Sequence, residues 1–163
     1  MREILFRGKP VVPGKYNGGS FAIGYYCCSP SGKHYIELST ASGCKNPVEV
    51  NPDTVGQYTG LTDKNGNKIF EGDIFKFNDE VWESFYTACG TEYDSYEVKN
   101  YGVVGFDEDR SCFDFVQYKF NENSVEADLH ENYDIEFADF ISELEVIGNI
   151  YDNPELLEGT NGN

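Results

Sequence analysis

The clearest structural signal in the chain is the segment Gln57-Tyr58-Thr59-Gly60-Leu61-Thr62-Asp63-Lys64-Asn65-Gly66-Asn67-Lys68-Ile69-Phe70. Its two ends contain aromatic and β-branched residues, which favour strands, and its centre contains Asn65-Gly66. Both of these residues tolerate the positive φ angles that a tight hairpin turn requires. The segment therefore predicts a β-hairpin near the middle of the chain.

Short segments with strand-like composition continue on both sides of this hairpin. The predicted strands are 3–7, 20–28, 34–38, 48–50, 57–61, 68–70, 74–77, 101–106, 112–118 and 145–151. Residues 39–46 are small and polar and predict a loop, and residues 137–144 alone have the pattern of one or two helical turns. The predicted class is therefore all-β with one short helical element, arranged as small, partly open barrels.

The charge is unevenly distributed along the 163 residues. Residues 1–60 contain six basic and four acidic groups, a net charge of +2, whereas residues 61–163 contain six basic and twenty-five acidic groups, a net charge of −19. A field of this sign repels phosphate backbones, so direct nucleic-acid binding is disfavoured, and it attracts basic protein surfaces. The alternative is that the charge serves solubility alone.

The cysteines and the hydropathy pattern predict a cellular compartment. The chain has five cysteines and no Cys-x-x-Cys motif. No apolar run is long enough to span a bilayer, and no signal-peptide apolar region follows Met1. The sequence therefore predicts a cytoplasmic protein with reduced thiols and no membrane association.

Motifs for metal, cofactor and catalytic sites are incomplete. The only cluster of metal-ligating residue types is Cys27, Cys28, His34 and Cys44. Adjacent residues of a strand point to opposite faces, so Cys27 and Cys28 cannot both reach one ion from a regular strand. The two histidines, His34 and His130, have no catalytic signature around them, and the carboxylates are too abundant for any pair to be informative. The sequence therefore predicts no catalytic residue, metal or cofactor.

Three longer segments of the chain resemble the signatures of the YopX family, whose members are proteins of bacteriophages and prophages. The segments are Met1-Arg2-Glu3-Ile4-Leu5-Phe6-Arg7-Gly8-Lys9, residues 54–74, which include the predicted hairpin, and Leu144-Glu145-Val146-Ile147-Gly148-Asn149-Ile150-Tyr151-Asp152-Asn153-Pro154-Glu155-Leu156-Leu157. The resemblance implies an SH3-type β-barrel in the C-terminal half, a smaller N-terminal β-rich part and a phage or prophage origin. It implies no known activity.

Together, the residues and the resemblance predict a division of the chain. Residues 1–56 form the N-terminal β-rich part, and residues 57–153 form the SH3-type barrel. Residues 154–163, rich in small and polar residues, form a flexible C-terminal tail. Residues 79–100 are expected to be an insertion, because they are longer than the connection typical of these strands.

The insertion is the predicted binding site. Its aromatic residues are Trp82, Phe85, Tyr86, Tyr93 and Tyr96, and acidic residues are interleaved with them. Aromatic anchors beside a charged rim are typical of protein interfaces. The alternative is that Trp82, Phe85 and Tyr93 cover a sheet face as a structural β-arm.

The predicted function is that of a phage or prophage accessory protein that acts as a non-enzymatic protein-binding module for a host or phage protein. Two alternatives remain open. One is an acidic nucleic-acid mimic that occupies a basic DNA-binding protein, and the other is a small hydrolase. Because a two-part β protein has edge strands, pairing of copies into a homo-oligomer is a further expectation.

Overall fold

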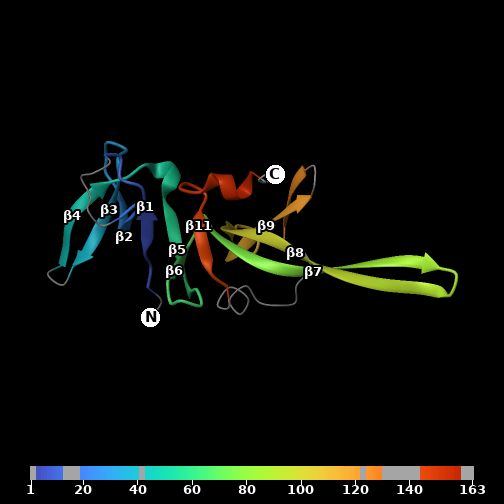
Figure 1. Ribbon diagram of the computed structural model, residues 1–163. Coiled ribbons are helices and arrows are strands. Elements are labelled where there is room, and N and C mark those ends of the chain that lie inside the picture. Colours follow the sequence, from blue (N-terminus) through green and yellow to red (C-terminus); the bar gives the residue numbers. More distant parts are fainter. Residues whose placement is uncertain (1–2, 13–18, 41–42, 122–123, 130–143, 159–163) are drawn as a thin grey trace. The chain divides into compact units, whose positions relative to one another are not determined.

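The computed structural model describes residues 3–12, 19–40, 43–121, 124–129 and 144–158 (Figure 1). It divides the chain into two compact units, Met1–Gly72 and Asp73–Asn163. Apart from two short 3-10 turns, η1 (Pro52–Thr54) and η2 (Pro154–Leu157), the described regular structure is entirely β. The all-β class is therefore confirmed.

The first unit is a six-stranded antiparallel sheet. Its strands are β1 (Phe6–Gly8), β2 (Ala22–Cys28), β3 (His34–Thr40), β4 (Gly43–Glu49), β5 (Gly56–Thr62) and β6 (Lys68–Phe70). Their order in the sheet is β4-β3-β2-β1-β5-β6, so the short strand β1 lies in the middle and pairs with β2 and β5.

Two expectations for this part of the chain differ from the structure. The predicted boundary at residue 56 separated β5 and β6 from the strands before them, but β5 pairs with β1, which places both strands of the central hairpin in the first unit. Residues 39–46 were expected to form a loop, but most of them belong to β3 and β4, which pair through Ser39 and Cys44. The pairing partner compensates for weak local strand propensity.

The first unit contains two groups of buried apolar side chains. One is formed by Ala22, Ile36 and Val50, and the other by Leu5, Tyr58 and Phe70. β2 lies close to β3 at Gly24, where an added Cβ would lie 2.0 Å from the backbone oxygen of Glu37. Only glycine permits this approach.

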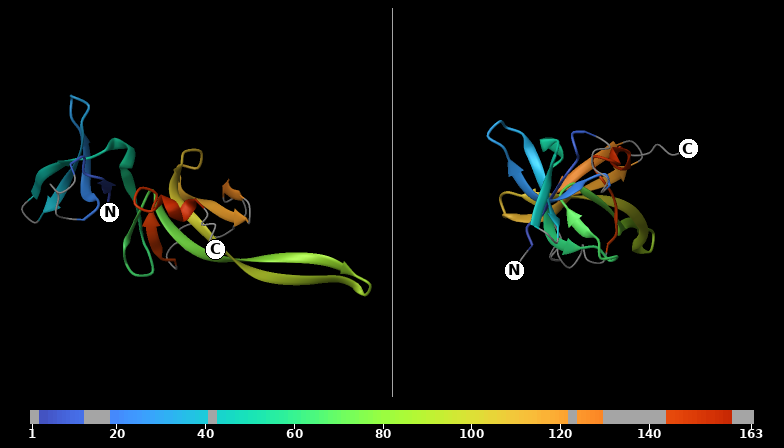
Figure 2. Two further views of the ribbon diagram at one scale, coloured as in Figure 1. Left: turned by 45° about the horizontal axis from the view of Figure 1, so that its top comes forward. Right: turned by 90° about the vertical axis from the view of Figure 1, so that its left-hand side faces the viewer.

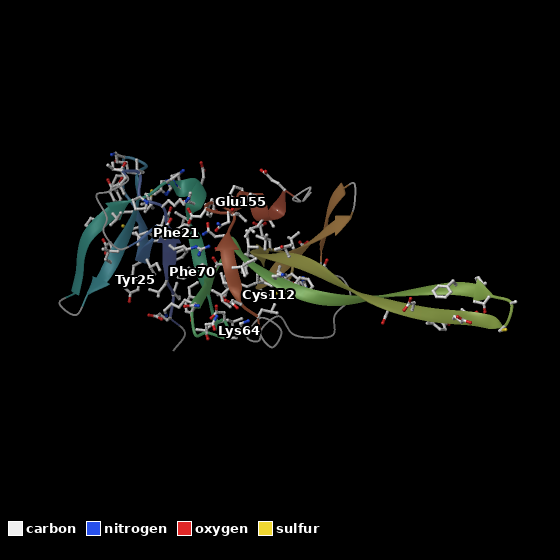
Figure 3. The ribbon with its side chains drawn as sticks, in the orientation of Figure 1. Phe21, Tyr25, Lys64, Phe70, Cys112 and Glu155 are labelled. Atoms are coloured by element: carbon white, nitrogen blue, oxygen red, sulfur yellow. The ribbon has the colours of Figure 1, made fainter. Side chains whose placement is uncertain are left out.

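A buried arginine connects the centre of this sheet to its edge. Arg7 of β1 lies with its guanidinium carbon 4.6 Å from the ring centroid of Phe21 and 5.1 Å from that of Phe70. Both rings are labelled in Figure 3. The Nη2 atom of Arg7 donates a 2.9 Å hydrogen bond to the backbone oxygen of Glu71. A planar guanidinium can stack on rings and donate hydrogen bonds at its edge at the same time, which a lysine cannot do.

The predicted central hairpin is confirmed as β5 and β6, but its turn differs from the one expected. Gly66 has a φ of 82°, whereas Asn65 does not have a positive φ. The N–H of Gly66 bonds to the backbone oxygen of Asp63, which indicates a type I turn followed by a left-handed glycine. The buried Asp63 carboxylate accepts hydrogen bonds from the backbone N–H groups of Asn65 and Asn67 and so holds the turn from inside.

The second unit is a five-stranded antiparallel sheet. Its strands are β7 (Asp73–Thr87), β8 (Gly90–Asp107), β9 (Cys112–Asn121), β10 (Ser124–Leu129) and β11 (Val146–Asn149), in the order β10-β9-β8-β7-β11. Within the described residues no pairing joins β10 to β11, so this sheet is open and an SH3-type barrel is not confirmed. The helical turn expected at residues 137–144 lies almost wholly outside the described residues, which resume at Leu144.

Three phenylalanine rings form the core of this second sheet. The ring centroid of Phe115 lies 5.1 Å from that of Phe75 and 6.0 Å from that of Phe77, and all three side chains are buried. Phe75 is directly opposite Gly102 in the β7–β8 pair, and an added Cβ on Gly102 would lie 2.3 Å from the Phe75 ring. The ring therefore covers the backbone of β8 at the position where no side chain stands.

This packing gives a testable difference between two glycines of β8. Gly102→Ala should lower the free energy of unfolding by about 1–3 kcal/mol, because the buried Phe75 ring would have to leave its position. Gly105→Ala is the matched control, since an added Cβ there meets nothing within 4 Å, and its effect should stay within about 0.5 kcal/mol. Urea unfolding followed by circular dichroism measures both, and equal effects would contradict the packing described.

Candidate functional site

The residues expected to be an insertion form the far end of one long hairpin. β7 and β8 pair without a register shift from Ile74 opposite Val103 to Thr87 opposite Gly90. We call residues 79–98 of this hairpin the arm. Figures 1 and 2 show the two strands continuing as a ribbon beyond the other strands of their sheet.

Neighbouring strands support the base of the hairpin but not the arm. β11 pairs with β7 only at residues 73–75, and β9 pairs with β8 only from Tyr101 onward. Among the strands that the structure describes, none pairs with the arm. The arm is therefore a two-stranded ribbon with two sheet edges, and its side chains at residues 84–94 are exposed to solvent.

The turn at the end of the arm is made by Ala88 and Cys89. The Thr87 hydroxyl donates to the backbone oxygen of Gly90 at 3.0 Å and accepts from the N–H of Cys89 at 3.3 Å. Gly90 has a φ of 135°, a conformation that side chains disfavour. These contacts close the hairpin without an Asn-Gly or Asp-Gly pair, which explains why no turn is predicted here from the sequence.

The register assigns the described side chains of the arm to two faces, because directly opposed residues of an antiparallel pair share a face. The residues of the first, the tyrosine face, are Ser84, Tyr86, Thr91, Tyr93 and Ser95. The residues of the second, the acidic face, are Phe85, Thr87, Glu92 and Asp94. Both described carboxylates lie on the acidic face, and in the register positions 80 and 97, nearer the base of the arm, fall on the same face as Tyr86 and Tyr93.

The structure separates the five aromatic residues predicted as the binding site. Tyr86 and Tyr93 share the tyrosine face and are 91% and 69% exposed, while Phe85 lies on the opposite face and is 43% exposed. Trp82 and Tyr96 belong to paired strand positions, but their side chains are outside the described set. Of the three residues in the structural alternative, Phe85 and Tyr93 have described side chains, and both are exposed.

Like charges oppose each other within the arm. Residues 79–98 contain six acidic and no basic residues. The register places Glu83 opposite Asp94 and Glu80 opposite Glu97. Like charges at directly opposed positions destabilise a strand pair, and a basic partner would offset this repulsion. Sequence reasoning found the acidic residues but could not find the pairs, because these depend on the register.

A carboxylate-arginine cluster holds the opposite end of β8, at its turn into β9. Arg110 Nε lies 2.7 Å from Asp107 Oδ2, and its Nη2 also bonds to Asp114. The backbone N–H and the guanidinium of Arg110 lower the pKa of the Asp107 carboxyl. These two carboxylates are therefore neutralised locally by Arg110.

The residue types weighed for metal binding and catalysis are not gathered into a site in the described part of the chain. No group of three His, Cys, Asp or Glu side chains that could hold a metal occurs there. Cys27 and Cys28 are consecutive residues of β2, and burial, followed by the Glu37 carboxylate, raises the pKa of the Cys27 thiol. His34 Nδ1 contacts the hydroxyl of Tyr26, and His130 lies outside the described residues.

Hydropathy gives one further finding about the described segments: none of their helices is both long enough and apolar enough to cross a membrane.

The fold and the arm define an all-β protein with an exposed, acidic and aromatic two-stranded projection. The family model described as YopX protein matches residues 26–158, which include the whole arm and most of both units. The chain belongs to the YopX family. A search of the curated proteins found no match.

The opposed acidic residues give a prediction for the stability of the arm. Asp94→Asn should stabilise the strand pair by about 0.2–1 kcal/mol, because it removes one of two opposed charges while the amide oxygen can still accept the Ser95 N–H bond. Amide hydrogen exchange of residues 84–94 should slow, and the difference should shrink at high salt.

The matched control is Glu108→Gln, which removes an exposed acidic charge from the β8–β9 turn and leaves the arm unchanged. Unchanged or faster exchange in the arm of Asp94→Asn would contradict the opposed arrangement of Glu83 and Asp94.

Proposed function

We propose that this YopX-family protein is a phage or prophage accessory protein that acts as a non-enzymatic protein-binding module, with the arm as the element that binds a basic host or phage protein. The observation that carries the proposal is the exposure of Tyr86 and Tyr93 on a ribbon that no described strand supports. We propose no catalytic residue and no cofactor.

The tyrosine face has the properties of an interface anchor. Tyrosine has a large apolar ring with few rotatable bonds and a hydroxyl that stays hydrogen-bonded, so its burial against a partner costs little entropy. Tyr86 and Tyr93 occupy diagonal positions on one face, where side chains of neighbouring strands lie about 7–8 Å apart. One partner surface could therefore cover both rings at once.

Charge supports the choice of a basic partner. The second unit, residues 73–163, contains four basic and twenty-three acidic residues, a net charge of −19. Such a field accelerates the encounter with a basic surface and makes the association rate fall as salt rises. In this account the acidic residues set the rate of association and the tyrosine face sets the lifetime of the complex.

The nucleic-acid mimic is the second candidate, because the same net charge of −19 would attract a DNA-binding protein. It differs from the first candidate in its dependence on the tyrosine face. A mimic competes with DNA for its partner and is released by salt, but it does not need Tyr86 or Tyr93. The hydrolase alternative has no comparable observation in its favour.

The test compares variants in quantitative affinity capture from bacterial lysates, with and without phage infection. Tyr86→Ala/Tyr93→Ala should reduce recovery of a basic protein at least about fivefold, because interface tyrosines commonly contribute more than 1 kcal/mol each. The control is Tyr25→Ala, which removes a tyrosine 46% exposed in the first unit and should retain the partner. Both variants should keep the wild-type melting temperature, because the altered side chains are exposed.

Two results would decide against the proposal. Equal recovery of the partner by the wild type and the double variant, with release by salt and by competing DNA, would favour the mimic. Equal recovery of the same proteins by all variants, without competition by DNA, would remove the arm from the function altogether.

A further inference from the structure

The arm offers a second kind of contact besides its two faces, namely its strand edges. A two-stranded ribbon presents the outward N–H and C=O groups of alternate residues along each edge, and another extended chain can pair with them. The pairing of β7 with β8 is regular to the last residue before the turn, so the edge of β8 at residues 90–94 continues the geometry of a sheet.

Two of the devices that block an exposed edge, proline and β-bulges, do not occur in this hairpin. Residues 73–107 contain no proline, and the β7–β8 register has no bulge. Lysine, the residue most used to protect edges, is absent from residues 79–98. Negative charge is the remaining protection, and it acts against other anionic strands but not against a basic one.

The same charge decides between the candidates for an added strand. A second copy of the arm would bring six further acidic residues beside the first six, which like-charge repulsion opposes. A segment containing lysine or arginine would instead neutralise them. Of the two strands, β8 has Glu92 and Asp94 at alternate positions and therefore on one face, whereas the acidic residues of β7 in the arm, at positions 79, 80 and 83, include no alternate pair.

We propose that the edge of β8 at residues 90–94 is a strand-addition site for an extended basic segment of a partner protein. This inference rests on the proposed function and names how the arm binds. Main-chain hydrogen bonds supply affinity, and the side chains of β8 select the sequence. Lysine or arginine is expected beside Glu92 and Asp94 on the acidic face, and aromatic or β-branched residues are expected beside Thr91 and Tyr93 on the tyrosine face. The preferred segment therefore alternates basic residues with aromatic or β-branched ones.

Two dye-labelled peptides of identical composition test this pattern on the full chain. One alternates, Thr-Lys-Val-Lys-Tyr-Lys-Thr, and the other groups its charges, Thr-Val-Tyr-Lys-Lys-Lys-Thr. Fluorescence anisotropy should show the alternating peptide binding at least about tenfold more tightly, a difference of about 1.4 kcal/mol. Equal affinities would overturn the inference, because charge alone would then account for binding.

Backbone methylation tests the hydrogen bonds themselves. An added strand uses the N–H groups of alternate residues, so two versions of the alternating peptide are made, each N-methylated at one alternate set. Strand addition predicts that one version loses binding and the other retains it. Retention by both versions overturns strand addition, and so does loss by both.

Variants of the protein separate this inference from the proposed function. Glu92→Gln/Asp94→Asn should weaken the alternating peptide at least about tenfold if the arm binds it, whereas the control Glu108→Gln/Asp109→Asn removes two charges from the β8–β9 turn and should have little effect. If the arm variant weakens both peptides equally, the arm binds basic partners without strand addition, and only this inference fails. If neither pair of substitutions changes binding, the proposed role of the arm fails as well.

Discussion

The arm depends on one packing contact, the Phe75 ring over Gly102. An isolated two-stranded hairpin is marginally stable in water, so a ribbon of this length needs an anchor. Phe75 is fully buried, β11 pairs with β7 at residues 73–75, and β9 pairs with β8 at residues 101–107. A side chain at position 102 would displace the ring and loosen the base from which both strands of the arm extend. The exposed end can be rich in acidic residues because this buried end holds the register.

The fixed base and the exposed end of the arm together favour binding of a partner. Because β7 and β8 are already paired, a partner does not have to order the arm when it binds, and less binding free energy is lost to ordering. The opposed acidic residues lower the stability of the free arm, and the positive charges of a basic partner would weaken this repulsion when it binds. The first unit is stabilised differently, by Arg7 held between Phe21 and Phe70 at the middle of its sheet. Each unit therefore has its own central contact.

Local signals predicted the β class and the short hairpins, whereas features set by pairing partners were missed. Asn65-Gly66 and Ser29-Pro30-Ser31-Gly32 mark real turns between β5 and β6 and between β2 and β3. Residues 79–100 are predicted as an insertion on their length alone, and the hairpin they form has no local signal, because Ala88-Cys89 is not a recognisable turn pair. The aromatic composition of the site was predictable, but the separation of Phe85 from Tyr86 and Tyr93 follows only from the β7–β8 register. Barrel closure depends on contacts between distant strands, which local patterns do not encode.

Amide hydrogen exchange on the full chain can show whether the arm is a formed ribbon anchored at Phe75. The slowest exchange is expected at residues 74–77 and 100–104, where the sheet flanks the hairpin. Exchange should become progressively faster toward Thr87 and Gly90, while every hydrogen-bonded position stays slower than in an unstructured chain. If the arm instead exchanges at the rate of an unstructured chain, no ribbon exists to bind a partner.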